Sequence, residues 1–116
     1  MRTINIGKLN KRITFLKLGE REDDMGQSTQ ALEEIKTVWA SFYPIRGMEF
    51  YEVQKVQGKV THKCYVRYLK GVDSSCYIKY EDKMYLITSA IDVDLEHKML
   101  EIYCVEYTGK EEAPNG

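Results

Sequence analysis

This 116-residue sequence has few of the side chains on which enzymes most often depend, since it contains only two histidines, His62 and His97. It also lacks the G-x-S-x-G and H-E-x-x-H motifs and any glycine-rich loop suited to phosphate. These absences disfavour the common hydrolase, metalloprotease and nucleotide-binding classes, and we predict no catalytic residue. A hydrolase that uses His62 is the third and weakest functional hypothesis.

Long hydrophobic runs are missing as well. The longest apolar stretches last a few residues, whereas a membrane-spanning helix needs about 20. The start, MRTINIGKLNKR, contains no apolar signal segment. The cysteines are odd in number and lack C-x-x-C spacing, which is typical of reduced cytosolic thiols; they are Cys64, Cys76 and Cys104. We therefore expect neither a membrane segment nor disulfide bonds.

Metal-ligand patterns are weak. His62 and Cys64 lie two residues apart on one predicted strand, and Cys104 could approach them from the last strand. Small residues of a buried strand face are the simpler interpretation. An acidic cluster near the end lacks the glycine and spacing of a calcium loop and is expected to be a solvated turn; it consists of Asp92, Asp94 and Glu96. No metal or other cofactor is predicted.

A strong net charge is also lacking, because the formal charge is −1 and the pI is about 6.1. The charges nevertheless form blocks: residues 1–18 contain five basic and no acidic groups, and residues 19–34 contain six acidic and one basic group. Proteins that clamp nucleic acid usually have a pI above about 9. Blocks of opposite sign could instead pair one subunit with the next.

Strand patterns dominate the rest of the chain. Apolar residues alternate with others in RITFLKL, in the segment ending TVWASFYP and in VTHKCYVRY, and short strands are predicted at YIKY, MYLITSAIDV and KMLEIYCVEY. In the second strand, Val38, Ala40 and Phe42 share one face. About six strands with short turns and no crossover helix predict an all-β fold, a small antiparallel barrel or sandwich.

Four segments do not fit a strand pattern. We expect a basic flexible arm over residues 1–11, a flexible loop over residues 19–30, and a disordered tail over residues 108–116, with the barrel domain spanning 12–107. The fourth is an insertion over residues 46–58. It is either a plain crossover loop capping one barrel end or a short amphipathic helix, and such a helix would be packed on the barrel or mobile until a partner binds.

A small nucleic-acid-binding barrel of the oligonucleotide-binding kind is the alternative function. Exposed tyrosines could stack on bases, and the basic strand face of Lys59, Lys63 and Arg67 could contact phosphates. The candidate stacking residues are Tyr51, Tyr65, Tyr77, Tyr80 and Tyr85. The balanced charge argues against this function.

Several motifs, taken in order, resemble one family. The segments are IGKLNKRITFLK, TVWASFYPIRGMEFYEVQKV, VTHKCYVRY and YEDKMYLITSAIDVDLEHKMLEIYCVE. Together they resemble the head closure proteins, also called head–tail adaptor or joining proteins, of long-tailed bacteriophages and prophages. The matching positions are Gly7, Leu9, Arg12 and Ile13, then Trp39 and Ala40, then Gly47, Glu49 and Phe50, then Thr61 and His62, then Arg67 and Tyr68. The resemblance covers residues 6–107.

This resemblance implies a structural protein without enzymatic activity that assembles into a dodecameric ring at the portal vertex of the virion. One side would dock on the portal or connector protein, and the other would receive a tail completion or tail terminator protein. Genomic DNA would pass through the middle without sequence-specific binding. A DNA conduit suits a near-neutral protein, because firm contacts between basic side chains and phosphates would hinder sliding. The free subunit is expected to be a monomer, and assembly would take place in the cytoplasm of the host bacterium.

Two sets of contact residues are predicted. The family's long loop corresponds here to residues 46–58 and would face the channel or a neighbour through Arg46, Met48, Glu49, Phe50, Tyr51, Gln54 and Lys55. From the charge blocks we infer subunit-interface candidates, basic at Lys8, Lys11 and Arg12 and acidic at Glu22, Asp23 and Asp24.

Overall fold

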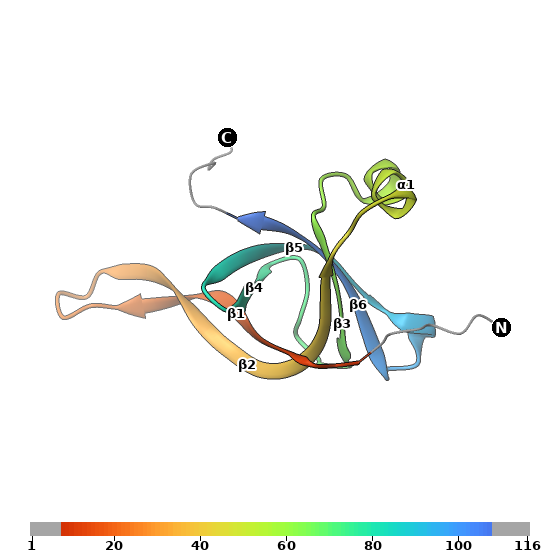
Figure 1. Cartoon of the computed structure of the whole chain (residues 1–116). Helices are drawn as coiled ribbons and strands as arrows, with labels where there is room; N and C mark the ends of the chain where they lie inside the picture. Colours follow the sequence, from red (N-terminus) through yellow and green to blue (C-terminus); the bar gives the residue numbers. More distant parts are fainter. Residues whose placement is uncertain (1–7, 108–116) are drawn as a thin grey trace.

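The computed structural model describes residues 8–107, which contain one antiparallel sheet closed into a six-stranded barrel (Figure 1). The neighbour order around the barrel is β1-β2-β3-β6-β5-β4. The strands are β1 (Lys11–Glu22), β2 (Ser28–Pro44), β3 (His62–Arg67), β4 (Cys76–Tyr80), β5 (Lys83–Asp92) and β6 (Met99–Tyr107). One helix, α1 (Met48–Gln57), lies between β2 and β3, and a 3-10 turn, η1 (Val93–Leu95), precedes β6. The all-β barrel prediction is confirmed.

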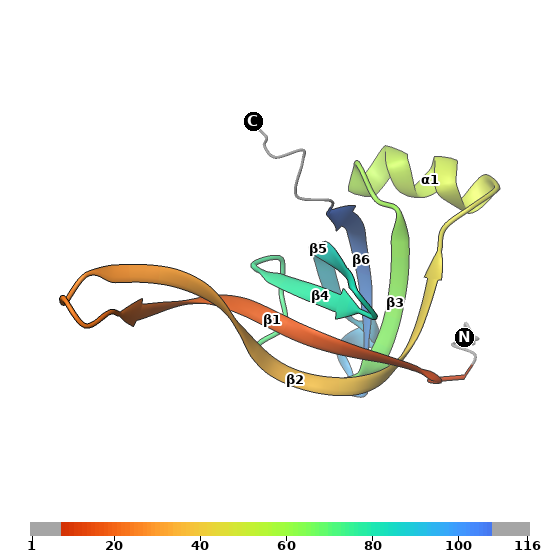
Figure 2. The same ribbon diagram turned by 60° about the vertical axis from the view of Figure 1, so that its left-hand side comes forward.

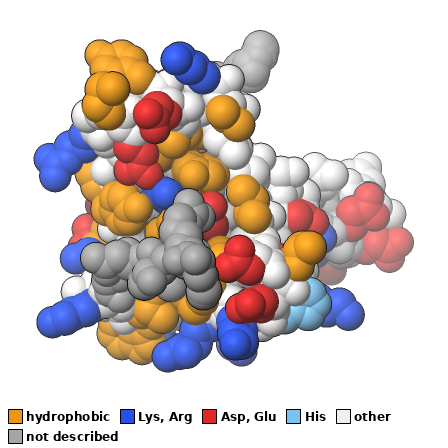
Figure 3. All heavy atoms as spheres, turned by 90° about the vertical axis from the view of Figure 1, so that its right-hand side faces the viewer, with side chains coloured by type: hydrophobic (Ala, Val, Ile, Leu, Met, Phe, Trp, Pro, Cys, Tyr) orange, Lys and Arg blue, Asp and Glu red, His pale blue; other side chains and the backbone are white. Residues whose placement is uncertain are grey.

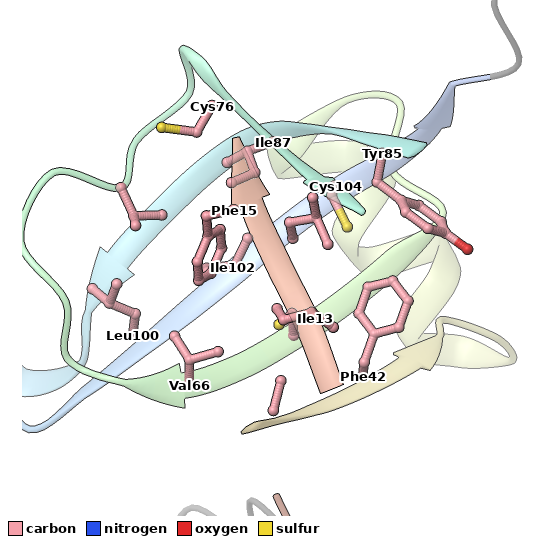
Figure 4. Close-up of a cluster of buried hydrophobic side chains, with 14 residues drawn as sticks. Ile13, Phe15, Phe42, Val66, Cys76, Tyr85, Ile87, Leu100, Ile102 and Cys104 are labelled. Atoms are coloured by element: carbon pink, nitrogen blue, oxygen red, sulfur yellow. The ribbon is translucent and has the colours of Figure 1, made fainter. Parts of the chain in front are cut away.

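The barrel core consists of inward-facing residues from all six strands, and it includes those that the sequence placed on one face of the second strand. Ala40 and Phe42 of β2 are buried with Cys64 and Val66 of β3, and Val38 packs against them. Figure 4 shows Phe42 and Val66 inside the barrel together with side chains from β1, β5 and β6. The largest fully buried side chains include Phe15, Ile13, Ile78 and Ile102. Burial of this apolar surface is the main source of the barrel's stability.

Two strands of the barrel continue beyond it as a projecting hairpin. Residues Thr14–Lys17 of β1 pair with β4 on one side, but the ladder between β1 and β2 runs on to Glu22 and Ser28. In Figures 1 and 2 this hairpin extends far to one side, which explains the elongated shape of 57 × 29 × 25 Å. The expected flexible loop over residues 19–30 is therefore wrong. Both hairpin faces are solvated, so no apolar alternation marks the strands, yet the backbones still pair.

The true connection between β1 and β2 is a tight turn at residues 23–27, which we call the hairpin tip. The Asp23 side chain accepts hydrogen bonds from the backbone N–H groups of Met25 (2.9 Å) and Gln27 (2.8 Å). Gly26 has a φ of 79° and its N–H donates to the carbonyl of Asp23. An Asp that satisfies its own turn and a glycine at positive φ are the residues that such a turn requires.

Two other boundaries differ from expectation. The predicted arm was to end at residue 11, but Lys11 already begins β1 and pairs with Ala40; residues 1–7 and the predicted tail 108–116 lie outside the described residues. The third strand begins at His62 instead of Lys59. Val60 leaves the barrel face because it packs against α1 in a separate cluster with Ile45, Val53 and Tyr103.

The insertion forms a helix that packs outside the barrel, beside the ends of β2 and β3 (Figure 2). Val53 is its buried residue, whereas Val56 is 81% exposed. Of the alternatives left open by the sequence, the structure has the packed helix. In Figures 1 and 2, α1 and the hairpin tip lie on opposite sides of the barrel. Within residues 8–107, no helix has the length and apolarity to cross a bilayer.

Candidate functional site

The helix α1 is attached to the barrel by a buried lysine as well as by Val53. Lys63 Nζ, on the outer face of β3, lies 2.9 Å from Glu49 Oε2 of α1 and 3.3 Å from Glu101 Oε2 of β6. Its ammonium also lies over the rings of Tyr65 and Tyr103. The Tyr65 hydroxyl donates to Glu101 at 2.7 Å. This cluster, the Lys63 network, joins α1 to β3 and β6 through charge-assisted hydrogen bonds.

The electrostatics of the Lys63 network keep the lysine charged. Burial alone would lower the pKa of Lys63, but its hydrogen bond to Glu49 and its contact with Tyr65 raise the pKa above the usual range. Burial, reinforced by the hydrogen bond to Glu101, raises the pKa of Tyr65. Lys63 is 9% exposed, so the sequence-based assignment of this residue to a phosphate-binding face is wrong.

The predicted contact residues of the insertion divide into two groups. Glu49 and Gln54 have partners within the chain, because Gln54 Nε2 donates to the carbonyl of Val60 at 2.9 Å while Glu49 binds Lys63. The others are exposed on the helix or just before it: Arg46, Met48, Phe50, Tyr51 and Lys55. Met48 and Tyr51 are 74% and 66% exposed. The exposed group forms a surface with apolar and basic side chains.

The predicted subunit-interface residues lie at the two ends of the hairpin strands. Glu22, Asp23 and Asp24 are at or beside the hairpin tip and are exposed. In Figure 3, acidic side chains gather on the faint, receding part of the molecule, which is the hairpin. Lys8, Lys11 and Arg12 lie at the start of β1 or just before it. Arg12 is ten residues before Glu22 along the strand, which corresponds to roughly 33 Å. The structure does not bring the two sets together within one chain.

An exposed tryptophan that the sequence analysis did not single out as a contact residue lies beside this basic end. The Trp39 side chain is 53% exposed on β2, and the Arg12 guanidinium lies 4.8 Å from the centre of its ring. Two adjoining hollows share Trp39 and Arg67, and we call them together the Trp39 groove. Its other lining residues include Leu9, Asn10, Arg12, Lys36, Tyr68 and Leu69. Figure 3 shows Lys and Arg side chains around apolar ones along the lower edge of this face.

Sequence alone indicates the outward position of Trp39 but not the groove around it. Val38, Ala40 and Phe42 are the inward residues of β2, so Trp39 had to point outward, and an outward tryptophan is unusual for a solvated face. In the structure, β1 pairs with β2 and Arg12 lies opposite Trp39. The missing information was the register, which only the bulge between Phe15 and Leu16 defines.

The weak metal-ligand pattern belongs to the barrel core. Cys64 and Cys104 are fully buried among apolar side chains, so the interpretation as core residues is confirmed. His62 stacks on Phe42, with ring centres 5.2 Å apart, and meets Tyr85 edge-on. Burial lowers the pKa of His62, with Glu106 opposing the shift. Among residues 8–107, no group of three or more possible ligand side chains converges.

Three of the eight residues proposed for the alternative nucleic-acid site are buried. Lys63 is paired beneath α1, and Tyr65 and Tyr85 are buried. Burial and, to a smaller extent, the negative charge of the neighbouring Glu106 raise the pKa of Tyr85 to about 12. Of the predicted basic face, only Lys59 and Arg67 are exposed. Burial of Lys63, Tyr65 and Tyr85 removes the centre of the proposed surface, because bases can stack only on accessible rings.

Comparison with known proteins decides the family. Residues 4–107 match the family model described as phage head completion protein. The chain belongs to the phage head completion protein family. The match covers the barrel, the hairpin and α1, and membership of this family gives the chain a structural role in completing the phage head.

Solved structures share the fold. The solution structure of protein SF1141 from Shigella flexneri 2a superposes with a TM-score of 0.74 at 26% sequence identity and covers 92% of this chain and 100% of that one. A chain from the virion of a native gene transfer agent particle gives a TM-score of 0.52 at 13% identity, covering 84% and 94%. The latter likeness shows the fold alone. No curated protein sequence matches the chain significantly.

Proposed function

We propose that this head completion protein is the head closure, or head–tail adaptor, subunit that forms a ring below the portal. Copies of the chain, twelve in the ring that the family resemblance implies, dock on the portal or connector protein. The opposite side of the ring receives the tail completion or tail terminator protein. Genomic DNA passes through the channel, and the subunit acts as a structural part without catalysis.

The projecting hairpin is the observation that carries this proposal. It extends away from a barrel whose core is complete without it, and its side chains are exposed, including Leu18 at 45% and Met25 at 81%. A monomer gains little from such an element, since exposed strand edges invite unwanted pairing. Partner subunits in a ring would cover it. The pairing of acidic Glu22, Asp23 and Asp24 with basic Lys8, Lys11 and Arg12 of the next copy would set the order of subunits.

The exposed side of α1 supports contacts on the opposite side of the barrel. Met48, Phe50 and Tyr51 present apolar surface next to the cations of Arg46 and Lys55. In the proposed ring this surface faces the channel or a neighbouring subunit. The helix is held by one apolar side chain and a few polar contacts, so it can adjust when the partner arrives.

Electron microscopy tests the proposal directly. The purified protein is mixed with DNA-filled, tail-less capsids from a phage mutant that lacks this gene. The expected result is new ring-shaped density at the portal vertex and capsids that retain their DNA. The Asp24→Lys variant at the hairpin tip should add less density, whereas Glu96→Lys, an exposed charge reversal in another turn, should behave as the wild type. A bare portal vertex at saturating wild-type protein would refute the proposal.

A further inference from the structure

The hairpin tip is a hydrogen-bonded turn that presents an apolar side chain. Asp23 holds the backbone of Met25 and Gln27 through two hydrogen bonds, while Met25 itself is 81% exposed. Acidic residues precede it on β1 and in the turn: Glu20, Glu22, Asp23 and Asp24. A pre-ordered turn loses little conformational entropy when it binds. The tip therefore offers a partner one exposed apolar side chain, Met25, surrounded by carboxylates.

The Trp39 groove has the complementary character. Its lining combines the exposed Trp39 ring and the apolar Leu9 and Leu69 with three basic residues, Arg12, Lys36 and Arg67. Methionine sulfur packs favourably against aromatic rings, and tryptophan and arginine are the residues most enriched in the centres of protein interfaces. The groove is thus suited to an apolar side chain that arrives with carboxylates.

These two surfaces cannot meet within one molecule. They lie at opposite ends of the same pair of strands, about ten residues and roughly 33 Å apart, and a continuous ladder cannot fold back on itself over that length. We propose that the hairpin tip of one copy docks in the Trp39 groove of the next, with Met25 against Trp39 and the hairpin carboxylates facing Arg12 and Arg67. The proposal builds on the proposed ring and names its subunit contact.

The contact joins two different surfaces, so each copy offers one free tip and one free groove. Repetition then continues from copy to copy and closes when the rotation per subunit fits a whole turn. Charge complementarity fixes the direction of the chain of subunits, because tip against tip and groove against groove bring like charges together. An isologous pair could not grow in this way.

Cysteine crosslinking in the full chain tests the contact. Gln27→Cys places a thiol at the tip beside an intact Met25, and Asn10→Cys places one at the groove beside an intact Trp39; both positions are exposed. The native cysteines are buried, and burial raises the pKa of Cys104 to about 12, which keeps these thiols unreactive. A protein carrying both substitutions should form a ladder of multimers with a short bismaleimide reagent, at high protein concentration and on capsids.

A control isolates the specific contact from random collision. Val56→Cys replaces the thiol at position 27 by one on α1, at a position that is likewise exposed (81%). With Asn10→Cys it should crosslink about tenfold more slowly, because it lacks electrostatic steering toward the groove. The faster reaction should slow when salt rises from about 0.05 M to about 0.5 M. Equal rates for the two proteins, in solution and on capsids, would overturn the proposal.

Variants of the two central side chains complete the test. Met25→Ser and Trp39→Ser, each in the crosslinking background, should reduce the ladder to the Val56→Cys rate, while Trp39→Phe should restore part of it. Thermal melting checks that each variant is folded. A ladder that persists without Met25 and Trp39 would overturn the assignment of these residues. Ring density on capsids without any tip-to-groove crosslink would refute this contact and leave the proposed function intact. Crosslinking without capsid binding would support the contact and refute the proposed function.

Discussion

The two halves of β1 have the same backbone pairing to β2 but very different surroundings. Residues Thr14–Lys17 are paired on both sides and contribute Phe15 and Leu16 to the interior, whereas the outer half is paired to β2 alone and its Leu18 is 45% exposed. The comparison shows that β1 is stabilised by side-chain burial in its first half and by backbone pairing alone in its second half. In the barrel, burial of side chains stabilises the fold; in the hairpin, backbone hydrogen bonds shape a surface that a partner would bury.

The largest test of this difference compares two apolar residues of one strand. Phe15→Ala removes a fully buried ring and should lower the free energy of unfolding by about 3–5 kcal/mol. Leu18→Ala, three residues later, removes a half-exposed side chain and should cost less than about 1 kcal/mol. Urea unfolding followed by circular dichroism measures both. Similar losses for the two variants would show that the hairpin is part of the cooperative core.

The next effect concerns the attachment of α1. Lys63→Gln removes the cation between Glu49 and Glu101, and the Glu101 side chain is 17% exposed. Glu101 keeps its hydrogen bond from the Tyr65 hydroxyl but loses its charged partner. Because a hydrogen bond to a charged group contributes about 1.5–3 kcal/mol, the unfolding free energy should fall by this amount. Lys83→Gln is the matched control, since its exposed pair with Glu106 at 3.8 Å should contribute less than about 1 kcal/mol. If both variants lose the same stability, the Lys63 network is not structural.

Hydrogen exchange compares the helix with the barrel in the intact protein. The amides of α1 should exchange faster than those of β6, because Val53 is the buried side chain of the helix whereas Leu100, Ile102 and Cys104 of β6 are in the core. Addition of filled capsids should slow exchange in α1 if the helix becomes ordered by docking. Amides of α1 as protected as those of β6 in the free protein would contradict this coupling.

The pH dependence of stability tests whether His62 is desolvated in the folded protein. Burial lowers the folded-state pKa of His62 below its ordinary value of 6.5, so the unfolded chain binds more protons once the pH falls through that value. The contribution of His62 is then present above about pH 6.5 and is lost as the pH falls below it. Wild-type protein should lose more unfolding free energy between pH 7.5 and pH 5 than His62→Phe, which keeps the stacking. Parallel losses would mean that His62 is solvated.

The sequence predicted the parts of the fold where burial imposes a pattern. Cys64 and Val66, or Ile102 and Cys104, alternate with outward residues because one face of each strand meets the core. The hairpin was not predicted, because paired residues such as Glu20 and Gln30 are both solvated. Strands that pair only through their backbones do not produce an alternation of polar and apolar side chains. Lys63 was misassigned for a related reason. Alternation shows which residues point outward, but not that α1 covers them.

The candidate contact residues show the same limit. Charge blocks in the sequence correspond to an acidic hairpin tip and a basic start of β1 in the structure, because charge can be counted along the chain. Trp39 required the register of β1 against β2, which depends on a bulge that has no clear sequence signal. A charged surface on one element can thus be recognised in the sequence, whereas a surface that two elements share follows only from the structure.

Deletion of the projecting hairpin is the largest change in sequence, but we expect it to have the smallest effect on stability. Replacement of residues 19–31 by a two-residue Asn-Gly turn joins Leu18 to Leu32, which already face each other in the ladder, and preserves the hairpin register. The unfolding free energy should change by less than about 1 kcal/mol, because the deleted residues are solvated and a shorter connection is easier to close. Ring density on filled capsids should nevertheless disappear. If the truncated protein fails to fold, the barrel needs the hairpin for its stability. If it folds and still assembles on capsids, the hairpin has no role in the ring. A truncated protein that keeps its stability but no longer assembles would show that the barrel folds by itself and that the hairpin acts only in contacts with neighbouring subunits.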